Sequence, residues 1–506
     1  MTAEPERPFT EAEVSACIKV LQAIAVDRGA LAHVDRPARL ALLEAAGRVS
    51  APERADQRRL AKAFRRKERL EDRAEDEALL DGTGIRTARR APVFLTPGAP
   101  RALPQSAAPA KPSGTDAPAS DKAGPELRSP RKCYVCKAEF RALHFFYDQL
   151  CPPCGDINYQ KRGQSADLRG RVALVTGARV KIGYQAAILL LRAGARVIVT
   201  TRFPHDAAQR YAREPDFASF ADRLEIHGLD LRLTPVVERF ARELTERCER
   251  LDFILHNACQ TVRRPPGFYA HLLEHEAAKL TALPAHVRPL VEAHHKRRRE
   301  IVADLDPARL SQAALTPEDI APAASASLFP QGALDADLQQ VDLRPHNSWR
   351  AKLADVPTVE LLEVQLVNAV APFVLSGKLK PLMEKHLTFD KHIVNVSAME
   401  GQFYREHKTD KHPHTNMAKA ALNMLTRTSA VDYAASGIYM NSVDTGWVTD
   451  EDPADLAAKK REVHGFHPPL DIVDGAARIC DPIFSGIATG KHAFGQFFKD
   501  YLPTDW

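Results

Sequence analysis

The sequence predicts an α/β fold in which a doubly wound parallel sheet follows a helical region and a small module built around four cysteines. From residue 168 onward, short apolar stretches alternate with amphipathic segments, which is typical of strands joined by helices. Two Cys-x2-Cys pairs stand before them, and apolar residues recur at helical spacing near the amino terminus. A chain of 506 residues is too long for one ordinary core, so we expect several folded units.

Residues 1–93 are expected to form the helical region. Thr10 and Glu13 have the spacing of a capping box, in which each side chain accepts a hydrogen bond from the other residue's free backbone amide. A second helix is expected over residues 36–49. Residues 53–77 are mostly charged and predict an exposed helix. Its basic side chains could contact RNA or a membrane surface, but interleaved acidic residues favour a solvated face.

Residues 94–130 are predicted to be a semi-extended linker. They are rich in Pro, Ala, Ser and Gly. They contain too few apolar groups to offset the entropy that is lost on ordering. The cysteine module is therefore expected to begin at residue 131.

The module at residues 131–163 has the spacing of a zinc-binding site. Its four cysteines form two pairs separated by fourteen residues: Cys133, Cys136, Cys151 and Cys154. Two such pairs supply four thiolates to one tetrahedral Zn²⁺, which leaves no open coordination position, so a structural zinc is expected. The aromatic residues between the pairs are expected to form a miniature core. His144 as a substitute ligand, and a partner- or nucleic-acid-binding finger, are the alternatives.

A strand–turn–helix–strand pattern over residues 171–202 predicts a βαβ unit. Its turn contains Thr176 and Gly177, followed by Gly183; glycines there let the backbone approach a pyrophosphate at the helix amino terminus. This turn resembles that of the short-chain dehydrogenase/reductase family, which has a Rossmann-like fold and the pattern Thr-Gly-x-x-x-Gly-x-Gly. Lys181 replaces the middle glycine. Its ammonium group can neutralise a phosphate but crowds the approach.

Further landmarks of that family follow in the family's order, over residues 168–260 and 355–500. The resemblance implies that Asp230 contacts the edge of the adenine ring. It also implies that Asn257 and Ala258 end a strand beside the nucleotide, and that Gly446 belongs to the turn beside the nicotinamide. The residues expected at the nucleotide are Thr176, Gly177, Arg179, Lys181, Ile182, Gly183, Arg202, Asp230, Asn257, Ala258, Lys419 and Gly446.

Charge at the end of the second strand favours NADP(H) over NAD(H). Thr201 and Arg202 stand where an acidic residue would bond the ribose 2′-hydroxyl of NAD(H). Arg202 and Arg179 are instead expected to meet a 2′-phosphate. Simple solvation of either arginine is the alternative.

The resemblance also implies a set of catalytic residues. Asn368 corresponds to the asparagine that helps hold a water in a proton relay, and Ser397 to the serine that hydrogen-bonds the substrate carbonyl. Lys419 corresponds to the lysine that binds the ribose and lowers the pKa of a tyrosine four residues earlier. Thr415 stands at that tyrosine's position, and its aliphatic hydroxyl ionises far too weakly to replace a phenol.

Three other residues are candidates for the missing acid. Tyr404 follows Ser397 by seven residues, in a segment that could fold over the site, and His412 and His414 flank the expected helix start. Imidazole titrates where a general acid is useful. For each of the three, a loop residue that faces solvent or packs is the alternative.

Residues 262–350 form an insertion relative to the family spacing and are expected to be a lid or packing element. Its His271, Glu274 and His275 match a metallopeptidase pattern, although a lid explains them more simply. Residues 294–299, "HHKRRR", are expected to be the exposed face of a helix. Trp349 is expected to anchor the end of the insertion.

The function expected from these observations is an NADP(H)-dependent oxidoreductase that acts on an unidentified carbonyl or alcohol. The alternative is a non-catalytic dinucleotide-binding scaffold or redox sensor that docks a protein partner through the zinc module or amino-terminal helices. A net charge of +5 does not indicate nucleic acid. No signal segment or membrane-length apolar run is evident, and scattered cysteines suit a reducing compartment, so a cytoplasmic location is expected. The resemblance implies a possible homodimer.

Overall fold

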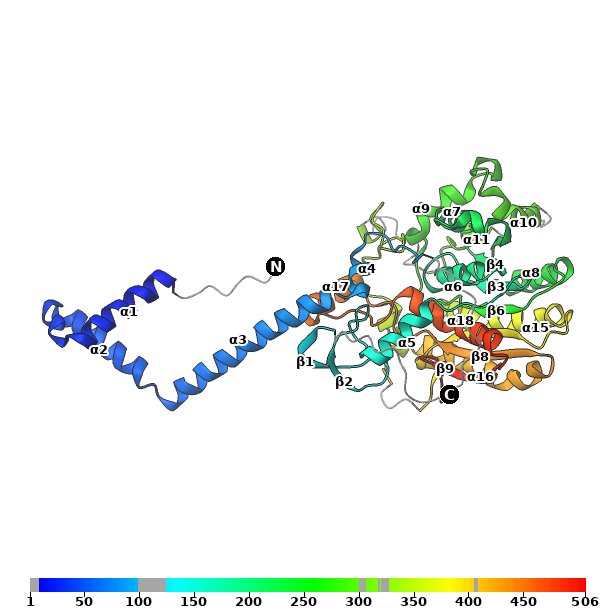
Figure 1. The fold of residues 1–506 in the computed structure, drawn as a ribbon. Coiled ribbons are helices and arrows are strands. Elements are labelled where there is room, and N and C mark those ends of the chain that lie inside the picture. The colour runs from blue at the N-terminus through cyan, green and yellow to red at the C-terminus, as the bar shows by residue number, and fades with distance from the viewer. Residues whose placement is uncertain (1–8, 99–123, 300–305, 317–318, 320–326, 405–407) are drawn as a thin grey trace, which may run out of the picture. The chain divides into compact units, whose positions relative to one another are not determined.

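The computed structural model describes residues 9–98, 124–299, 306–316, 319, 327–404 and 408–506 (Figure 1). The chain divides into two compact units, Met1–Asp76 and Glu77–Trp506. The first unit is helical, and the second contains the cysteine module and the doubly wound sheet.

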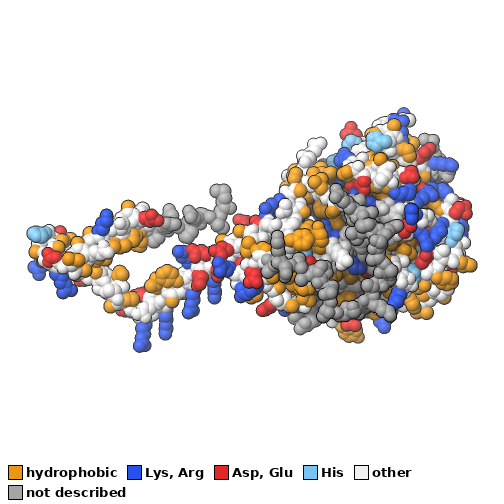
Figure 2. All heavy atoms as spheres, viewed as in Figure 1, with side chains coloured by type: hydrophobic (Ala, Val, Ile, Leu, Met, Phe, Trp, Pro, Cys, Tyr) orange, Lys and Arg blue, Asp and Glu red, His pale blue; other side chains and the backbone are white. Residues whose placement is uncertain are grey.

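The amino-terminal unit is built from helices, as predicted. They are α1 (Glu11–Val26), a 3-10 turn (Arg28–His33), α2 (Arg36–Ser50) and α3 (Arg54–Asp81), whose last residues belong to the second unit. The capping box is present: the Glu13 backbone amide donates to Thr10 Oγ1 at 3.2 Å, and the Thr10 amide donates to Glu13 Oε2 at 2.8 Å. Charged side chains line α3, mostly basic in its first half and mostly acidic in its second (Figure 2), as expected of a helix with a solvated face.

The sheet of the second unit has eight strands and confirms the predicted fold class. Their order is β10-β9-β8-β7-β6-β3-β4-β5, and all neighbours pair in parallel except β9 and β10. The strands are β3 (Val172–Thr176), β4 (Arg196–Thr201), β5 (Leu224–Gly228), β6 (Phe253–His256), β7 (Lys391–Ser397), β8 (Ile438–Asp444), β9 (Phe497–Lys499) and β10 (Leu502–Thr504). Strand order reverses beside β3, because β4 lies on one side of it and β6 on the other. Ligands bind at such a crossover.

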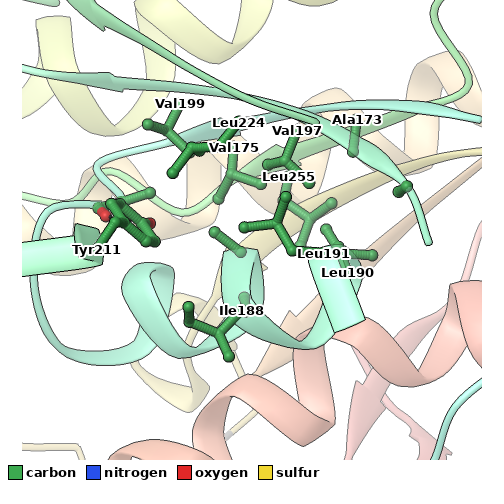
Figure 3. Packing of buried hydrophobic residues seen from close by; sticks show 14 of the residues in the cluster. Ala173, Val175, Ile188, Leu190, Leu191, Val197, Val199, Tyr211, Leu224 and Leu255 are labelled. Carbon is green, nitrogen blue, oxygen red and sulfur yellow. Dashed lines mark hydrogen bonds between the residues drawn. The ribbon is translucent and has the colours of Figure 1, made fainter. Parts of the chain in front are cut away.

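Helices cover both faces of this sheet. The helices α6 (Lys181–Arg192), α7 (Pro204–Ala212) and α18 (Ile472–Thr489) pack on one face, while α8 (Thr234–Arg247), α15 (Ala371–Glu384) and α16 (Pro413–Ala435) cover the other. Ile188, Leu190 and Leu191 of α6 lie in one buried cluster with Val175 and Val197 of the strands (Figure 3). Apolar side chains on both faces of every central strand explain the continuous apolar stretches in the sequence.

The helix before β7 is long and locally irregular. It runs from α14 (Thr358–Gln365) through a π-helical turn (Leu366–Val370) into α15. By length and composition alone this stretch could cross a membrane, which the sequence prediction did not anticipate. Leu375, Leu379 and Leu382 of α15 are instead buried in the core under the sheet, which accounts for its apolar character.

The insertion, residues 262–350, forms α9 (Pro266–Ala277), α10 (Arg288–Arg299) and α11 (Pro307–Leu310). It has its own apolar cluster, which includes Phe268 and Phe329 and extends to Phe203 of the sheet domain. The prediction that residues 294–299 are simply an exposed face was wrong. His294 is buried and accepts a hydrogen bond from the Gly228 backbone amide at 3.2 Å, because α10 packs against the edge strand β5.

The cysteine module consists of β1 (Glu126–Lys132), β2 (Glu139–Ala142) and α5 (Pro152–Arg162), and α4 (Gly84–Arg90) packs against it. The boundaries predicted for the linker need correction at both ends. Thr96 receives a hydrogen bond from Gln185 at 3.0 Å, and β1 begins at Glu126. The middle of the predicted linker, residues 99–123, lies outside the described residues.

The module does not have a core of its own, contrary to the prediction. Its buried Phe140 and Tyr147 belong to a cluster that also contains Leu470, Ile472 and Val473 at the start of α18. Polar contacts join the same surfaces: Arg162 pairs with Asp471 at 2.7 Å and with Asp474 at 2.9 Å, and the Tyr147 hydroxyl donates to Asp474 at 2.5 Å. The module and the sheet domain therefore share one core.

Candidate functional site

A cavity of about 1010 Å³ opens at the carboxyl ends of the parallel strands. The residues at or just beyond the ends of β4, β6, β7 and β8 line it, at the crossover beside β3. Of the residues predicted to contact the nucleotide or substrate, those that line it are Gly177, Arg179, Lys181, Ile182, Gly183, Arg202, Asp230, Asn257, Ala258, Ser397, Lys419 and Gly446.

The turn after β3 requires glycine at two positions. Gly177 has φ +68°, and a Cβ on it would lie 2.7 Å from Ala258 Cα. A Cβ on Gly183 would lie 2.2 Å from Asn257 Nδ2 and 2.6 Å from the Gly177 carbonyl oxygen. The bare backbone therefore faces the cavity at the start of α6, as pyrophosphate binding requires.

Lys181 adopts a backbone conformation that favours glycine. Its φ is +55°, a left-handed backbone that costs an L-residue with a side chain roughly 1–2 kcal/mol. The lysine therefore occupies a position suited to glycine, and it lines the wall of the cavity.

Thr176 and Asn257 fix the position of this turn through hydrogen bonds. Asn257 Nδ2 donates to the carbonyl oxygens of Thr176 and Gly177 at 3.1 and 3.2 Å, and the Ala258 amide donates to Thr176 Oγ1 at 3.0 Å. Thr176 is buried and does not line the cavity. The predicted contact of Thr176 with the nucleotide is therefore replaced by a positioning role.

Arginines converge at the end of β4, on the phenol of Tyr269 from the insertion. Arg202 donates to the Tyr269 hydroxyl at 2.6 Å, and its guanidinium lies 4.6 Å from that ring's centre. Burial alone would raise the pKa of Tyr269, but Arg202, Arg264 and Arg179 lower it. Among the described residues no carboxylate lies within ion-pair distance of Arg202, so its charge is available to a phosphate.

The other predicted arginine is already paired. Arg179 is buried and lies 2.7 Å from Asp206, which also pairs with Arg210 at 2.7 Å. Asp230 is likewise engaged, because Arg232 donates to it at 2.6 Å. Burial opposes ionisation of Asp230, but the Arg232 guanidinium holds the pKa of Asp230 below its ordinary value. Both residues still line the cavity.

Ser397 and Lys419 both line the cavity. Ser397 ends β7; its hydroxyl is buried and has no hydrogen-bond partner among the described residues. Lys419 lies on α16, and its Nζ donates to the Val396 carbonyl oxygen at 2.7 Å. Since buried polar groups are normally hydrogen-bonded, the Ser397 hydroxyl can still donate a hydrogen bond to a ligand oxygen.

Asn368 lies in the π-helical turn and acts on the loop after β6. Its Oδ1 accepts from the Gln260 amide at 2.8 Å, and its Nδ2 donates to the Gln260 carbonyl at 3.0 Å. It is buried and does not line the cavity. Single π turns often occur at functional sites, and this one places a side chain that fixes a cavity wall.

The structure does not bring the predicted substitutes for the phenol to the cavity. His414 is buried and does not line the cavity, and the same holds for Thr415 at the phenol's own position; within the described part of the chain, the Thr415 hydroxyl and both His414 ring nitrogens have no hydrogen-bond partner. His412 stacks on Trp349 with ring centres 4.0 Å apart. The side chain of Tyr404 is 94% exposed and lies outside the cavity wall.

The four cysteines of the module form one cluster. Their sulfur atoms all lie within 4.8 Å of one another, which fits four ligands of one tetrahedral metal. The Cys151 backbone amide donates to Cys133 Sγ at 3.4 Å, and the Ala138 amide lowers the pKa of Cys136 to about 7. The Ala138 contact favours a thiolate at Cys136, whereas burial raises the pKa of Cys151 and Cys154.

Other candidate ligands lie apart from this cluster. His144 accepts from the Phe146 and Tyr147 amides at 3.1 and 3.2 Å, so it stabilises the loop. His271, Glu274 and His275 do not gather either. Within the described part of the chain, only the four cysteines bring three or more ligand atoms together.

The cysteine module also supplies a wall of the cavity, which the sequence did not predict. Tyr134, between the first two cysteines, lines it, and its hydroxyl accepts from the Trp447 amide at 3.0 Å. The neighbouring Gly446 has φ +73°, and a Cβ on it would lie 2.5 Å from Leu470 and 3.4 Å from the Tyr134 hydroxyl. The turn beside the expected nicotinamide is therefore packed against the module.

A carboxylate at the end of β8 was also missed. Asp444 pairs in register with Ser397 across β7 and β8, and both side chains line the cavity. Burial first, then the charges of Glu400 and Asp500, raise the pKa of Asp444 to about 6. Strand register, which the sequence alone does not reveal, identifies this residue.

Two family models match the chain. One is described as short chain dehydrogenase and matches residues 171–282; the other is described as Enoyl-(Acyl carrier protein) reductase and matches residues 290–467. The two matches run from the first strand of the sheet through the loops that follow β8. The chain belongs to the short-chain dehydrogenase/reductase family.

Relatives in this family differ in how much of the chain they match. Uncharacterized protein R665 of Acanthamoeba polyphaga mimivirus is 30% identical over 373 residues, which cover 70% of this chain and 72% of that protein. That share of the chain is longer than residues 164–506, so the likeness begins before the sheet domain. Dehydrogenase/reductase SDR family member 13 of Bos taurus is 31% identical over 170 residues, or 31% of this chain and 42% of that protein.

Solved structures match the chain at low sequence identity. The RhlG/NADP active-site complex of Pseudomonas aeruginosa is 18% identical, with a TM-score of 0.40, and the match covers 65% of this chain and 94% of that one. A short chain dehydrogenase from Burkholderia cenocepacia in complex with NADP is also 18% identical, with a TM-score of 0.41, over 65% of this chain and 96% of that one.

Proposed function

We propose that this short-chain dehydrogenase/reductase is an NADP(H)-dependent oxidoreductase that acts on a carbonyl or alcohol. The observation that carries the proposal is that Ser397 and Lys419 line the same cavity as the glycine turn. Ser397 offers an unpartnered buried hydroxyl to a substrate oxygen, and Lys419 places an ammonium group where a ribose would lie. Bound NADPH would supply a hydride from the nicotinamide ring, which the protein must orient and shield.

The preference for NADP(H) is supported by the charges at the end of β4. Arg202 has no carboxylate partner among the described residues, and it lies beside a tyrosine whose pKa three arginines lower. An ionised 2′-phosphate would meet this positive field, whereas a ribose hydroxyl would gain little from it. Two of the similar solved structures hold NADP, which agrees with this preference.

We also propose that the four cysteines hold a structural zinc ion. The cluster has the ligand type, number and spacing of a closed site. The ion would fix the hairpin that carries Tyr134 and, through Trp447, the turn at Gly446. Zinc would thus support the reaction cavity without entering it.

A second copy of the chain is the partner that we propose. Met417, Met424 and Val431 are exposed at seven-residue intervals along α16, which places them on one face of that helix, and Phe373 is exposed on α15. Monomeric surfaces rarely leave large apolar groups exposed in one patch. Pairing of two copies across these helices would cover them.

One observation favours a non-catalytic alternative, in which the chain binds the nucleotide as a scaffold or redox sensor. The family's phenol is absent at Thr415, and Tyr404 lies outside the cavity. In that case the nucleotide would bind but no hydride would be transferred.

The test is NADPH oxidation by the purified chain in the presence of electron-poor carbonyls such as 4-nitrobenzaldehyde and 9,10-phenanthrenequinone. The proposal expects absorbance loss that depends on the carbonyl and disappears in Ser397→Ala, while NADPH still binds. Tight NADPH binding without turnover of any carbonyl or alcohol would instead support the scaffold.

A further inference from the structure

Asp444 is the strand partner of Ser397, the serine whose hydroxyl is expected to bind substrate. Ser397 and Asp444 are Cα partners at the carboxyl ends of β7 and β8. Partner residues on adjacent parallel strands point to the same face of the sheet, and the strands lie about 4.8 Å apart. Both side chains line the cavity, so one ligand oxygen can approach both.

Asp444 is neither exposed nor neutralised by an ion pair. It is 6% exposed, and its Oδ1 accepts one hydrogen bond, from the Met399 amide at 3.3 Å. Among the described residues no Lys, Arg or His nitrogen lies within 4.0 Å of its oxygens. A buried carboxyl group without a neighbouring cation is costly to ionise. Packing alone therefore does not explain why an aspartate stands at this position.

The charges that face Asp444 come from several elements. Glu400 after β7 and Asp500 after β9 disfavour its ionisation, while Lys499 and Arg478 favour it. Tyr134 approaches from the cysteine module; burial and then the charge of Asp444 raise the pKa of Tyr134. With burial as the largest effect, the pKa of Asp444 rises to about 6 from its ordinary 3.8, within the range useful to a general acid.

We propose that Asp444 takes the place of the absent tyrosine as the proton-transferring residue, an inference that rests on the proposed oxidoreductase function. In reduction, hydride adds to the carbonyl carbon of the substrate, and the carboxyl proton of Asp444 passes to the carbonyl oxygen while Ser397 donates a hydrogen bond to it. The product is the alcohol, and Asp444, left as a carboxylate, regains a proton from water. In oxidation Asp444 accepts the hydroxyl proton as the hydride leaves for NADP⁺.

Other polar groups of this region suit the role less well. The Tyr134 hydroxyl already accepts a hydrogen bond from Trp447. Thr415 and His414 lie outside the cavity wall. Glu400 lines the cavity, but it lies beyond the end of β7, outside the register that places Asp444 opposite Ser397.

The first measurement needs neither substrate nor nucleotide. Infrared difference spectra of the ligand-free chain between pH 4 and pH 8 should show a protonated-carboxyl band that titrates near pH 6 and is missing in Asp444→Asn. Asp390→Asn is the matched control, because Asp390 pairs with Arg171 away from the cavity, and its spectrum should keep that band. A band that persists in Asp444→Asn would overturn the inference.

The second measurement uses NADPH with 4-nitrobenzaldehyde. Asp444→Asn should bind NADPH within twofold of the unmodified chain but lose roughly 10²–10⁴-fold in kcat, the usual contribution of a general acid. If the unmodified chain turns over and Asp444→Asn turns over equally, the inference fails while the proposed function stands. If the unmodified chain binds NADPH and reduces no carbonyl, the proposed function itself fails.

The pH profile distinguishes proton transfer from a structural role. Reduction requires protonated Asp444, so its rate should fall above about pH 6, whereas oxidation should rise through the same range. Glu400→Gln removes a charge that disfavours ionisation of Asp444, so it should move both profiles to lower pH. Profiles that do not move would contradict the assignment.

Discussion

The cavity has two halves, one around the glycine turn after β3 and one around Ser397, and they differ in how many of the family's residues they retain. In the nucleotide half the glycine turn, its supporting Asn257 and the arginine at the end of β4 are all present, and even Lys181 adopts a glycine conformation. In the reaction half Ser397 and Lys419 are kept, but the phenol is missing. The cysteine module and Asp444 line the wall there instead.

This difference shows which constraints the fold can relax. The nucleotide half depends on backbone positions that admit no Cβ, so a substitution there disturbs the turn itself. The reaction half needs one group able to exchange a proton near a fixed hydroxyl, and any neighbouring strand end can supply it. A proton-transferring side chain can therefore be replaced by one from another strand more easily than a glycine turn can be replaced.

Cys151→Ala should produce the largest effect, because it breaks the support of the reaction half. Loss of one ligand should release the metal, and removal of a structural metal is among the changes that cost more than about 4 kcal/mol. We expect zinc content to fall from one per chain to none, and Tm to drop by roughly 10 °C. Metal analysis and calorimetry measure both.

Cys17→Ala is the control for this prediction. Cys17 is exposed and lies outside the cluster, so its zinc content and Tm should match those of the unmodified chain. Full zinc content in Cys151→Ala would contradict the four-cysteine site.

Gly183→Ala should break the nucleotide half. The added methyl group would lie 2.2 Å from Asn257 Nδ2 and 2.6 Å from a carbonyl oxygen, so the turn must shift. NADPH affinity, followed by fluorescence titration, should fall at least 100-fold, about 3 kcal/mol. Gly377→Ala is the matched control: a Cβ there has no atom within 4 Å on an exposed helix surface, so it should gain up to about 1 kcal/mol in stability and bind normally.

The pH dependence of stability sharpens the comparison, because Asp444 carries a raised pKa. A carboxyl group can have a higher pKa in the folded state than in the unfolded state. Such a group contributes its full stabilisation at pH values below its unfolded-state pKa, and that contribution is lost as the pH rises through its folded-state pKa. With 3.8 and about 6 for the two states, urea unfolding should give Asp444→Asn a higher unfolding free energy than the unmodified chain, by about 3 kcal/mol at pH 8 and by less at pH 5.

Asp390→Asn should change the unfolding free energy in the opposite direction in the same urea-unfolding experiment. Burial raises the pKa of Asp390, but the Arg171 guanidinium more than offsets this and lowers it. Its contribution is therefore present at high pH and lost as pH falls, so Asp390→Asn should lose stability at pH 8. An Asp444→Asn variant that behaves in the same way would show that Asp444 is an ordinary ionised residue.

Lys181→Gly should have the smallest effect. Glycine removes the roughly 1–2 kcal/mol cost of the left-handed conformation but adds freedom to the unfolded chain. We expect a net gain of about 0.5–1 kcal/mol in urea unfolding. A loss of stability would mean that contacts of the lysine side chain outweigh its backbone strain.

The sequence was most informative where a function depends on local spacing. The glycine turn, Ser397, Lys419 and the four cysteines each follow from a short motif, and the alternation of strands and helices predicts the sheet that brings them together. The capping box at Thr10 and Glu13 was predictable for the same reason, since both partners lie within one helical turn.

Features that depend on contacts between distant segments were not predictable. Arg179 was expected at a phosphate, but Asp206 holds it. Asp444 is one of many acidic residues until the register of β7 and β8 sets it beside Ser397. Tyr134 reaches the cavity only because the cysteine module shares a core with α18, and the exposed Tyr404 shows that closeness in sequence does not ensure closeness in space.

Calorimetric titration of the purified chain with NADPH and with NADH, repeated on Arg202→Ala, tests the central claim most directly. NADPH should bind at least tenfold more tightly than NADH, and Arg202→Ala should abolish this difference by weakening NADPH alone, since a charge-assisted phosphate contact contributes about 1.5–3 kcal/mol. Equal affinities in the unmodified chain, or no heat with either nucleotide, would contradict the claim that this cavity holds NADP(H).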